Sequence, residues 1–182
     1  MTTFYLDMDG VVADWDRAAT EFLKEPKSVA MAGEPEGRWS KELWDRLLAN
    51  QHFYRTLPKM AQADRMVNIG REFRDRLGYE FMFLSAIPKG NDVPWAFWDK
   101  MQWAQENYPD VPVMFGPYSQ DKQHHCRPGD ILVDDREDNC VRWSAVEGHA
   151  IHVTADYDLA LEQALRLLHQ RSQEAEREAR QR

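Results

Sequence analysis

Hydrophobic and polar residues follow two different patterns along the chain. Short apolar runs bounded by turn residues are typical of buried strands, and apolar residues recurring every three or four positions are typical of helices. The short runs predict strands at residues 4–6, 79–84, 111–115, 131–133 and 148–153. The helical periodicity of apolar residues predicts helices at residues 16–24, 40–48, 61–77, 98–103, 139–145 and 155–182. This alternation predicts an α/β fold with a Rossmann-like parallel sheet and right-handed crossovers.

Several residues mark where these elements begin or end. Pro26 ends the first helix, Ser40 is a candidate cap for the second, and Gly78 ends the third. Pro112 places the third strand at an edge of the sheet or at a strand start. The last helix is rich in leucine and then almost wholly charged from Arg171 onward. We expect its first half to dock on the sheet, with an oligomer contact as the alternative, and its end to be solvated.

Residues 25–60 differ in character from the rest of the chain. After a loop rich in glycine, four aromatic residues crowd together: Trp39, Trp44, Phe53 and Tyr54. They either form a small packed subcore or belong to a cap over a pocket, where aromatic faces stack on nucleobases at about 1–3 kcal/mol per base. The cap interpretation divides the chain into a core domain at residues 1–24 and 61–170, a small cap at residues 25–60 and a solvated helical tail at residues 171–182.

Composition narrows the class of protein. The 182 residues fit one domain with a small insertion, and 43% hydrophobic and 12% aromatic content can build a core rather than a disordered chain. The formal net charge of −8 argues against a duplex nucleic-acid binder, which would carry a basic face. It allows a small phosphorylated substrate, because a metal ion and a few local Lys or Arg side chains can reverse the sign of the charge within a pocket.

The chain also lacks the sequence marks of secretion and of membranes. Its two cysteines, Cys126 and Cys140, form neither a disulfide framework nor a Cys-x-x-Cys metal pair. The first residues enter a strand without a signal-peptide pattern, and no apolar run approaches the ~20 residues of a membrane helix. We therefore expect a cytoplasmic protein with no membrane partner.

Two carboxylates stand one residue apart at the end of the first predicted strand. Asp7 and Asp9 are followed by Gly10, and ligands of α/β sheets bind at the carboxyl ends of strands. Two acids this close both stay ionised only when a cation or several donors neutralise them. Oxygen-rich sites of this kind suit Mg²⁺, which binds one or two carboxylates together with substrate phosphate. The plain alternative is an Asx-type turn.

A second acidic pair strengthens this interpretation. Asp134 and Asp135 end the predicted strand at 131–133. A strand-terminating turn would explain this pair alone, but with acids already at another strand end a shared Mg²⁺ explains both pairs. By themselves, Ser85 at the end of a strand and Lys122 before the next one carry little information. The adjacent His124 and His125 cannot share a helical metal-ligand face, so we expect them at the surface or in a loop.

These motifs resemble those of the haloacid dehalogenase-like (HAD) phosphatases. Residues 7–11 resemble motif I, Asp-x-Asp-Gly-Val, and the longer stretch 7–15 looks most like the 5'(3')-deoxyribonucleotidase branch. Ser85 lies at the position of motif II, although the loop reads Ser-Ala-Ile-Pro where the branch usually has Thr-Ser-Pro-Ile. Lys122 is the candidate for motif III, and residues 134–139 resemble motif IV of the nucleotidases.

Two further stretches are similar to the same branch. Residues 53–58 resemble its aromatic-aromatic-Arg-x-Leu-Pro stretch, and residues 99–103 resemble its Glu-Lys-x-x-Trp. The resemblance implies a parallel sheet of the HAD type with the small helical cap inserted after motif I.

The resemblance also assigns roles to the motif residues. Asp7 would be the nucleophile that forms an aspartyl-phosphate, and Asp9 would act as the general acid and base. Mg²⁺ would be held by Asp7, the main-chain carbonyl of Asp9, and Asp134. The phosphoryl oxygens would be bound by these residues: Ser85, Ala86 and Lys122. Asp135 would hold a metal-bound water or orient Lys122.

The implied substrate is a nucleoside monophosphate, with a deoxy sugar favoured. Trp39, Phe53 and Tyr54 are the candidate cap residues that would meet it. Alternatives stay open: a HAD phosphatase for another small phosphoester such as a sugar phosphate, a non-catalytic phosphate-binding HAD protein, or a phosphatase of nucleic-acid ends, which the acidic charge disfavours. The sequence also leaves open whether the chain forms a homodimer.

Overall fold

The computed structural model describes residues 1–26, 40–88 and 93–181, and parallel strands form its centre. Within these ranges the sheet has five strands in the order β3-β2-β1-β4-β5, each paired in parallel with its neighbours. The strands are β1 (Thr3–Leu6), β2 (Glu80–Ser85), β3 (Val113–Phe115), β4 (Ile131–Asp134) and β5 (His149–His152). The predicted α/β fold with a Rossmann-like parallel sheet is confirmed.

Two of the inner strands, β1 and β4, are fully buried. Every residue of β1 and β4 is buried, as expected of strands with helices on both faces. The short β3 is an edge strand that starts directly after Pro112, as its proline predicted. The carbonyl of Pro112 still accepts a hydrogen bond from the Phe83 amide at 2.9 Å, so proline is tolerated where only its acceptor is needed.

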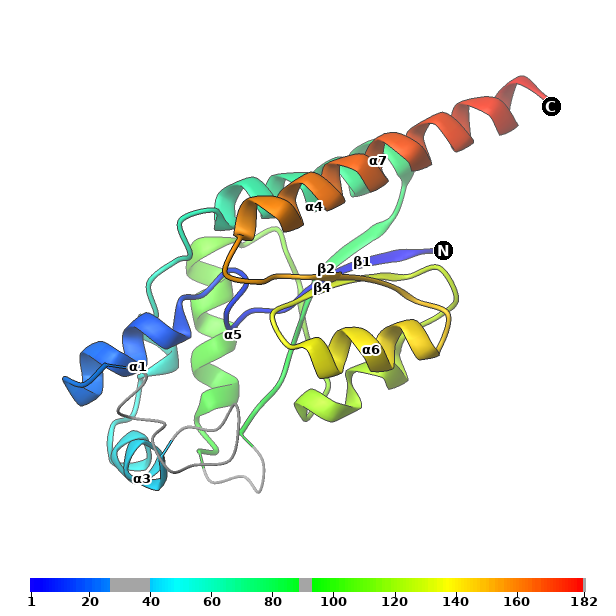
Figure 1. Cartoon of the computed structure of the whole chain (residues 1–182). Helices are drawn as coiled ribbons and strands as arrows, with labels where there is room; N and C mark the ends of the chain where they lie inside the picture. The colour runs from blue at the N-terminus through cyan, green and yellow to red at the C-terminus, as the bar shows by residue number, and fades with distance from the viewer. Residues whose placement is uncertain (27–39, 89–92, 182) are drawn as a thin grey trace.

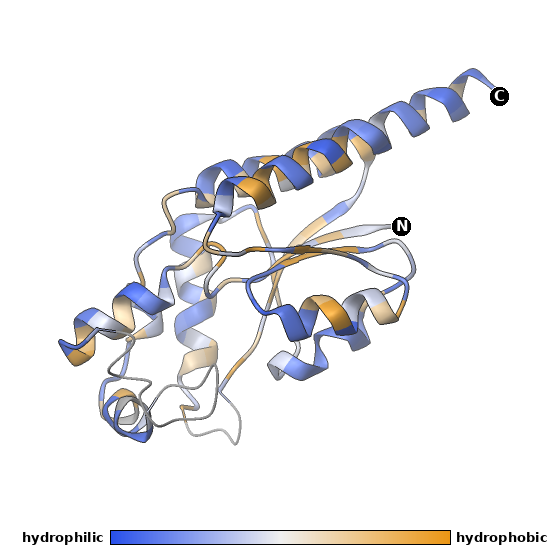
Figure 2. Ribbon diagram, viewed as in Figure 1, coloured by the Kyte–Doolittle hydropathy of each residue, from blue (hydrophilic) through white to orange (hydrophobic). Residues whose placement is uncertain are grey.

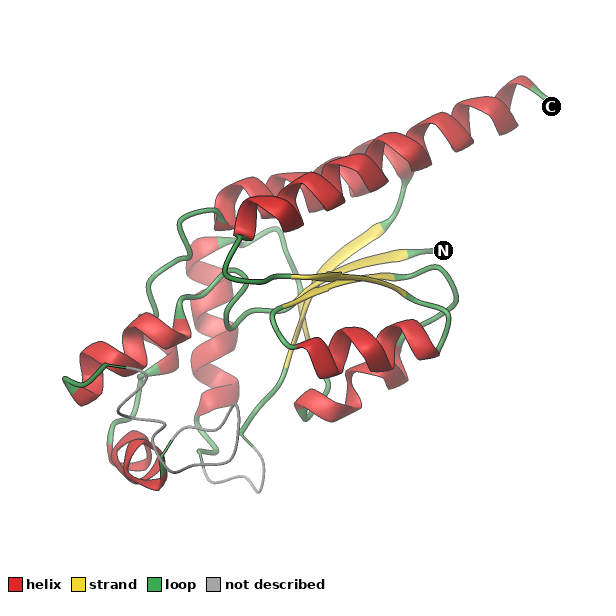
Figure 3. Cartoon of the chain, in the orientation of Figure 1, coloured by secondary structure: helices red, strands yellow, loops and turns green. Residues whose placement is uncertain are grey.

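Helices cover both faces of the sheet (Figures 1 and 3). On one face, α4 (Ala63–Leu77) packs on β1 and β2, and α7 (Tyr157–Arg180) packs on α4 and β5. On the other face, α6 (Glu137–Ala145) packs on β4 and β5 beside the 3₁₀ segment η3 (Ser119–His125). Gly78 ends α4 in the left-handed conformation, with φ of 69°, as the sequence predicted.

One glycine sets how closely α4 approaches the sheet. A Cβ atom on Gly70 would lie 2.4 Å from the ring of Phe81 in β2. The helix therefore contacts the strand through its backbone at this point, and a side chain would push the two apart.

The remaining helices lie at the end of the sheet that faces away from the start of β1 (Figure 1). They are α1 (Trp15–Leu23), α3 (Lys41–Ala49), the 3₁₀ segment η1 (Tyr54–Thr56) and α5 (Ala96–Asn107). Trp15 of α1 contacts both Trp44 and Phe53, with ring centroids 5.9 and 6.2 Å apart, and Phe22 also contacts Phe53. Aromatic packing therefore joins α1, α3 and the segment before η1.

The leucines of α7 divide between two environments. Leu161 and Leu168 are buried, whereas Leu159 and Leu165 are 45% and 48% exposed. The helix docks on α4 as well as on the sheet, because α4 already covers the strands beneath it. Beyond Arg171 it is mostly exposed and hydrophilic, and it extends past the sheet (Figures 1 and 2).

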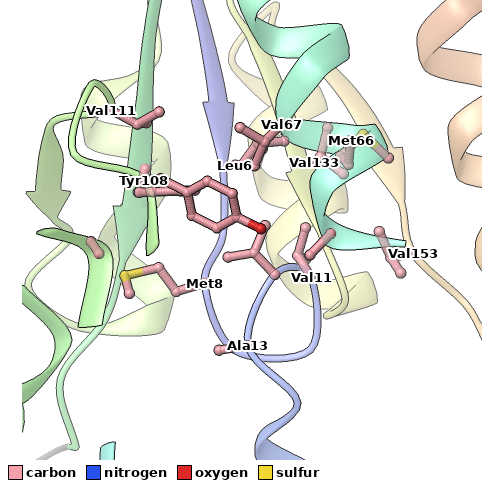
Figure 4. Close-up of a cluster of buried hydrophobic side chains, with 14 of the residues drawn as sticks. Leu6, Met8, Val11, Ala13, Met66, Val67, Tyr108, Val111, Val133 and Val153 are labelled. Atoms are coloured by element: carbon pink, nitrogen blue, oxygen red, sulfur yellow. The ribbon is translucent and has the colours of Figure 1, made fainter. Parts of the chain in front are cut away.

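The loop after β1 is part of the core (Figure 4). Met8, Val11 and Ala13 are at most 1% exposed, and the Met8 carbonyl accepts hydrogen bonds from the amides of Val12 and Ala13. The hydroxyl of Tyr157 donates to the Val11 carbonyl at 2.6 Å, which ties the loop to α7. This packing gives the residues on either side of Met8 fixed positions.

Among the helices within the described ranges, none has both the length and the apolar character that crossing a membrane requires.

Candidate active site

Three strands that are neighbours in the sheet deliver polar side chains to one place. Asp7 follows β1, Ser85 ends β2 and Asp134 ends β4. All three are buried, with exposed fractions of 6%, 0% and 0%. Because parallel strands end at the same edge, residues far apart in the sequence meet there, where ligands of such sheets bind.

Lys122 joins two of the strand ends. Its Nζ lies 2.8 Å from Oδ1 of Asp7 and 2.7 Å from Oδ2 of Asp134, and the residue is 1% exposed. Burial disfavours the charged amine, but Asp134 and Asp7 outweigh it and raise the pKa of Lys122. Lys122 is therefore a permanent cation between the two carboxylates, supplied by η3 from one face of the sheet.

The carboxylates are nevertheless more numerous than this cation can neutralise. The pKa of Asp7 is raised to about 6, mainly by burial against the opposing effect of Lys122, with repulsion from Asp134 and Asp9 contributing to the rise. Asp135 is exposed as a residue, yet desolvation of its carboxylate raises its pKa, and repulsion from Asp7 and Asp134 adds to the effect. The site thus carries an excess of negative charge that a further cation would relieve.

The donor set suits a hard divalent cation. One oxygen each from Asp7, Asp134 and Asp135 lies within 4.8 Å of the others. Carboxylate oxygens are the ligands that Mg²⁺ takes, so these residues fit it. The sequence led us to expect the main-chain carbonyl of Asp9 as a ligand, and the side chain of Asp9 faces a different partner. Asp135, expected outside the ligand set, contributes an oxygen to the group.

The partner of Asp9 is Lys100, which the motifs did not single out. Lys100 of α5 is 2% exposed, and its Nζ lies 2.6 Å from Oδ2 of Asp9 and donates to Ser85 Oγ at 3.0 Å. The available signal was the Glu-Lys-x-x-Trp resemblance at residues 99–103. Oδ1 of Asp9 is buried and accepts no hydrogen bond from the described residues.

Two features position the acidic pair at β4. Asn139 of α6, 3% exposed, donates from Nδ2 to both carboxylate oxygens of Asp134 at 3.0 and 3.1 Å. Gly10 has φ of 74°, and a Cβ there would lie 2.5 Å from Oδ2 of Asp135. Glycine therefore provides both the left-handed turn and the space in which Asp135 sits against the loop after β1.

The remaining predicted residues have diverse surroundings. Ala86 follows Ser85 at the end of β2 and is half-buried. Phe53 is 5% exposed within its aromatic contacts, which favours the packed subcore for this residue. Tyr54 is 2% exposed, and its ring lies 5.0 Å from the Nζ of Lys100. Trp39 lies outside the described residues.

The two adjacent histidines, which we expected at the surface or in a loop, lie in η3. His124 is exposed and His125 is half-buried in η3, where a ring nitrogen lies 3.3 Å from the Gly116 carbonyl.

The matches of this chain to known proteins lie among solved structures. No protein-family model matches the chain, and no curated protein matches it. Among solved structures, the chain is similar to the crystal structure of a HAD hydrolase, family IA, variant 3, from Entamoeba histolytica HM-1:IMSS. The identity is 10%, the TM-score is 0.43, and the match covers 84% of this chain and 83% of the other. The chemistry of the site therefore rests on its own residues.

Proposed function

We propose that this protein is a Mg²⁺-dependent phosphomonoester hydrolase of the HAD type. The observation that supports it most is the pair of buried lysines, Lys122 and Lys100, set against the carboxylates at the carboxyl edge of the sheet. A phosphomonoester is a dianion that must be approached by another anion, and fixed cations lower the barrier by stabilising the charge of the transition state.

Asp7 is the proposed nucleophile. It is held by the core-packed loop, and its main-chain amide donates to the Val133 carbonyl at 2.9 Å. The Met8 amide donates to Asp7 Oδ1 at 2.7 Å, which fixes the side-chain rotamer. Attack of the carboxylate on phosphorus forms an aspartyl-phosphate and expels the alkoxide, and attack of water then releases phosphate and restores the carboxylate.

Asp9 is the proposed general acid and base. It would protonate the leaving alkoxide and then take a proton from the hydrolytic water. Its buried Oδ1 has no hydrogen-bond partner among the described residues and is an acceptor for that water or alcohol. Lys100, at 2.6 Å from the other oxygen, would stabilise the carboxylate after the proton has left.

Mg²⁺ would be held by Asp7 and Asp134, with Asp135 beside them and the main-chain carbonyl of Asp9 as a further ligand. When bound, the metal neutralises charge on the phosphoryl group. Ser85, Ala86 and Lys122 would bind the phosphoryl oxygens. Residues 25–60 are the proposed cap over this edge.

For the substrate we propose a nucleoside monophosphate, with a deoxy sugar favoured. The support is the resemblance of residues 7–15, 53–58 and 99–103 to the deoxyribonucleotidases. A different small phosphoester, such as a sugar phosphate, would use the same Asp7 and Asp9. A non-catalytic phosphate-binding role is the further alternative. Duplex nucleic acid and membranes are not proposed partners.

The test is phosphate release from a panel of ribo- and deoxynucleoside monophosphates and sugar phosphates, with Mg²⁺ and with EDTA. We expect Mg²⁺-dependent release from deoxynucleotides, abolished in Asp7→Asn. Release from sugar phosphates alone would refute the nucleotide assignment and keep the chemistry.

The matched control is Asp138→Asn, which removes an exposed carboxylate that pairs with Arg142 on the surface of α6. It should keep full activity. Equal release by the wild type and Asp7→Asn would show that this site is not catalytic.

A further inference from the structure

A buried acid outside the proposed chemistry lies next to Lys100. Asp99 is 1% exposed, and Oδ1 lies 3.3 Å from a guanidinium nitrogen of Arg55 and 3.5 Å from Nδ1 of His52. A buried carboxylate is costly to desolvate, and such pairs are weak evidence for stability. The contacts of Asp99 therefore point to a role other than stability.

Asp99 belongs to a row of residues along α5 that contacts the segment 52–57. Trp95, Asp99 and Trp103 follow one another at intervals of four, so they share a face of the helix. The Trp95 ring contacts Tyr54 at 6.1 Å between centroids, and Trp103 Nε1 donates to the Leu57 carbonyl at 2.7 Å. Asp99 supplies the charged contact in the middle of this row.

The unpartnered atoms of the pair complement each other. Oδ2 of Asp99, an acceptor, and Nε of Arg55, a donor, are both buried and have no hydrogen-bond partner within the described ranges. They belong to side chains already in ionic contact. A small approach of the guanidinium would turn one 3.3 Å contact into a two-bonded fork that satisfies both atoms.

The position of this segment bears directly on Lys100. Arg55 follows Tyr54, whose ring lies 5.0 Å from the Nζ of Lys100. Lys100 follows Asp99 on the helix and turns instead to Asp9 and Ser85. Anchoring η1 on Asp99 therefore sets the aromatic wall beside the ammonium group.

We propose that Asp99 is a positioning residue that anchors η1 on α5 through Arg55 and so holds Lys100 against Asp9 and Ser85. The kinetic consequence rests on the proposed phosphatase function, but the placement of Lys100 does not. Loss of the anchor should leave the fold intact and let the ammonium group move away from its partners. Displacements of about 1 Å in catalytic geometry cost on the order of 10²-fold in rate.

The first experiment does not depend on phosphatase activity. Lysine reactivity is measured by brief labelling of the folded protein with acetic anhydride and mass spectrometry, in wild type, Asp99→Asn and Arg55→Gln. We expect labelling of Lys100 to rise about tenfold in both variants, because the ion pair with Asp9 that protects its Nζ from the reagent is lost. Two internal controls should not change: buried Lys122, which has its own carboxylates, and exposed Lys41.

The second experiment is kinetic. For Asp99→Asn we expect kcat for phosphate release to fall about 10- to 100-fold with a smaller change in KM. Arg55→Gln should show the same loss, the double variant should be no worse than either single one, and Arg55→Lys should recover part of the rate. Asp110→Asn, which breaks ion pairs with Arg71 and Arg74 away from the site, should keep kcat.

The outcomes separate the two proposals. Unchanged labelling of Lys100 in Asp99→Asn would overturn the positioning role. An equal rise in labelling at Lys122 would also overturn it, because it would show that the whole site has loosened. Wild-type protein that releases no phosphate, combined with selective exposure of Lys100 in the variants, would refute the phosphatase function and retain the anchor.

Discussion

The Nζ of Lys100 lies 2.6 Å from Oδ2 of Asp9, across 91 positions of sequence. The lysine is 2% exposed, and the same nitrogen donates to the hydroxyl of Ser85. A helix outside the four motifs thus supplies the cation for the proposed acid-base residue. The site consequently has two lysine–carboxylate units, one around Asp7 and one around Asp9.

Replacement of Lys100 by methionine should separate these two units. Lys100→Met keeps the length and the apolar stem but removes the charge, so we expect kcat to fall on the order of 10²-fold, as for loss of a preorganised charge-stabilising group. Steady-state phosphate release measures it. Lys41→Met, at an exposed pair with Asp45, is the control and should be silent. An unchanged kcat in Lys100→Met would remove Lys100 from the mechanism.

Asp7 should make the metal-free protein less stable as the pH rises. Its folded-state pKa of about 6 exceeds the value near 3.9 of an unfolded aspartate. The folded state therefore binds this proton more tightly, and the resulting stability is present below about pH 4 and lost as the pH passes about 6. Asp7→Asn removes that loss and should be more stable than wild type at pH 7.5 by up to about 3 kcal/mol.

Thermal unfolding in EDTA at pH 4.5 and 7.5 measures this effect. The difference between Asp7→Asn and wild type should be large at pH 7.5 and shrink at pH 4.5, at roughly 2–4 °C in Tm per kcal/mol. Asp138→Asn, an exposed acid, should show no such pattern. A variant less stable than wild type at pH 7.5 would contradict the excess of negative charge inferred here.

Magnesium should stabilise the fold through the acidic group at the sheet edge. At a free concentration 100 times the dissociation constant, a ligand adds about 2.7 kcal/mol, which is a rise of several degrees in Tm. Asp134→Asn should abolish the rise, since it removes one of the clustered carboxylates. Asp138→Asn should retain it. A wild-type Tm that Mg²⁺ does not change would argue against a metal site.

The approach of α4 to the sheet should tolerate no side chain at Gly70. Although alanine favours helices over glycine by about 1 kcal/mol, its Cβ would lie 2.4 Å from the Phe81 ring. We expect Gly70→Ala to cost about 1–3 kcal/mol as overpacking does, measured by urea unfolding. Asn68→Ala, exposed on the same helix, should stay within about 0.5 kcal/mol. A stabilised Gly70→Ala would show that the strand can yield.

The parallel character of the sheet and the ends of its strands can be predicted from the sequence alone. Apolar runs closed by acids placed Asp7 and Asp134 at strand ends, and strand–helix alternation implied a parallel sheet. These are local properties: a strand's burial and its terminus are written in consecutive residues. Because parallel strands end at one edge, the sequence also predicts that the two acids meet.

The partners of these acids, in contrast, depend on how distant helices pack against the sheet. The direction in which Lys100 points depends on the rotation of α5 about its axis. Aromatic residues are spread through the segment 95–103, so the sequence does not show which face of the helix is buried. The same holds for Phe53, whose ring is enclosed by Trp15 and Phe22 from another helix. A long side chain finds its partner through packing between distant segments, and no local pattern records that packing.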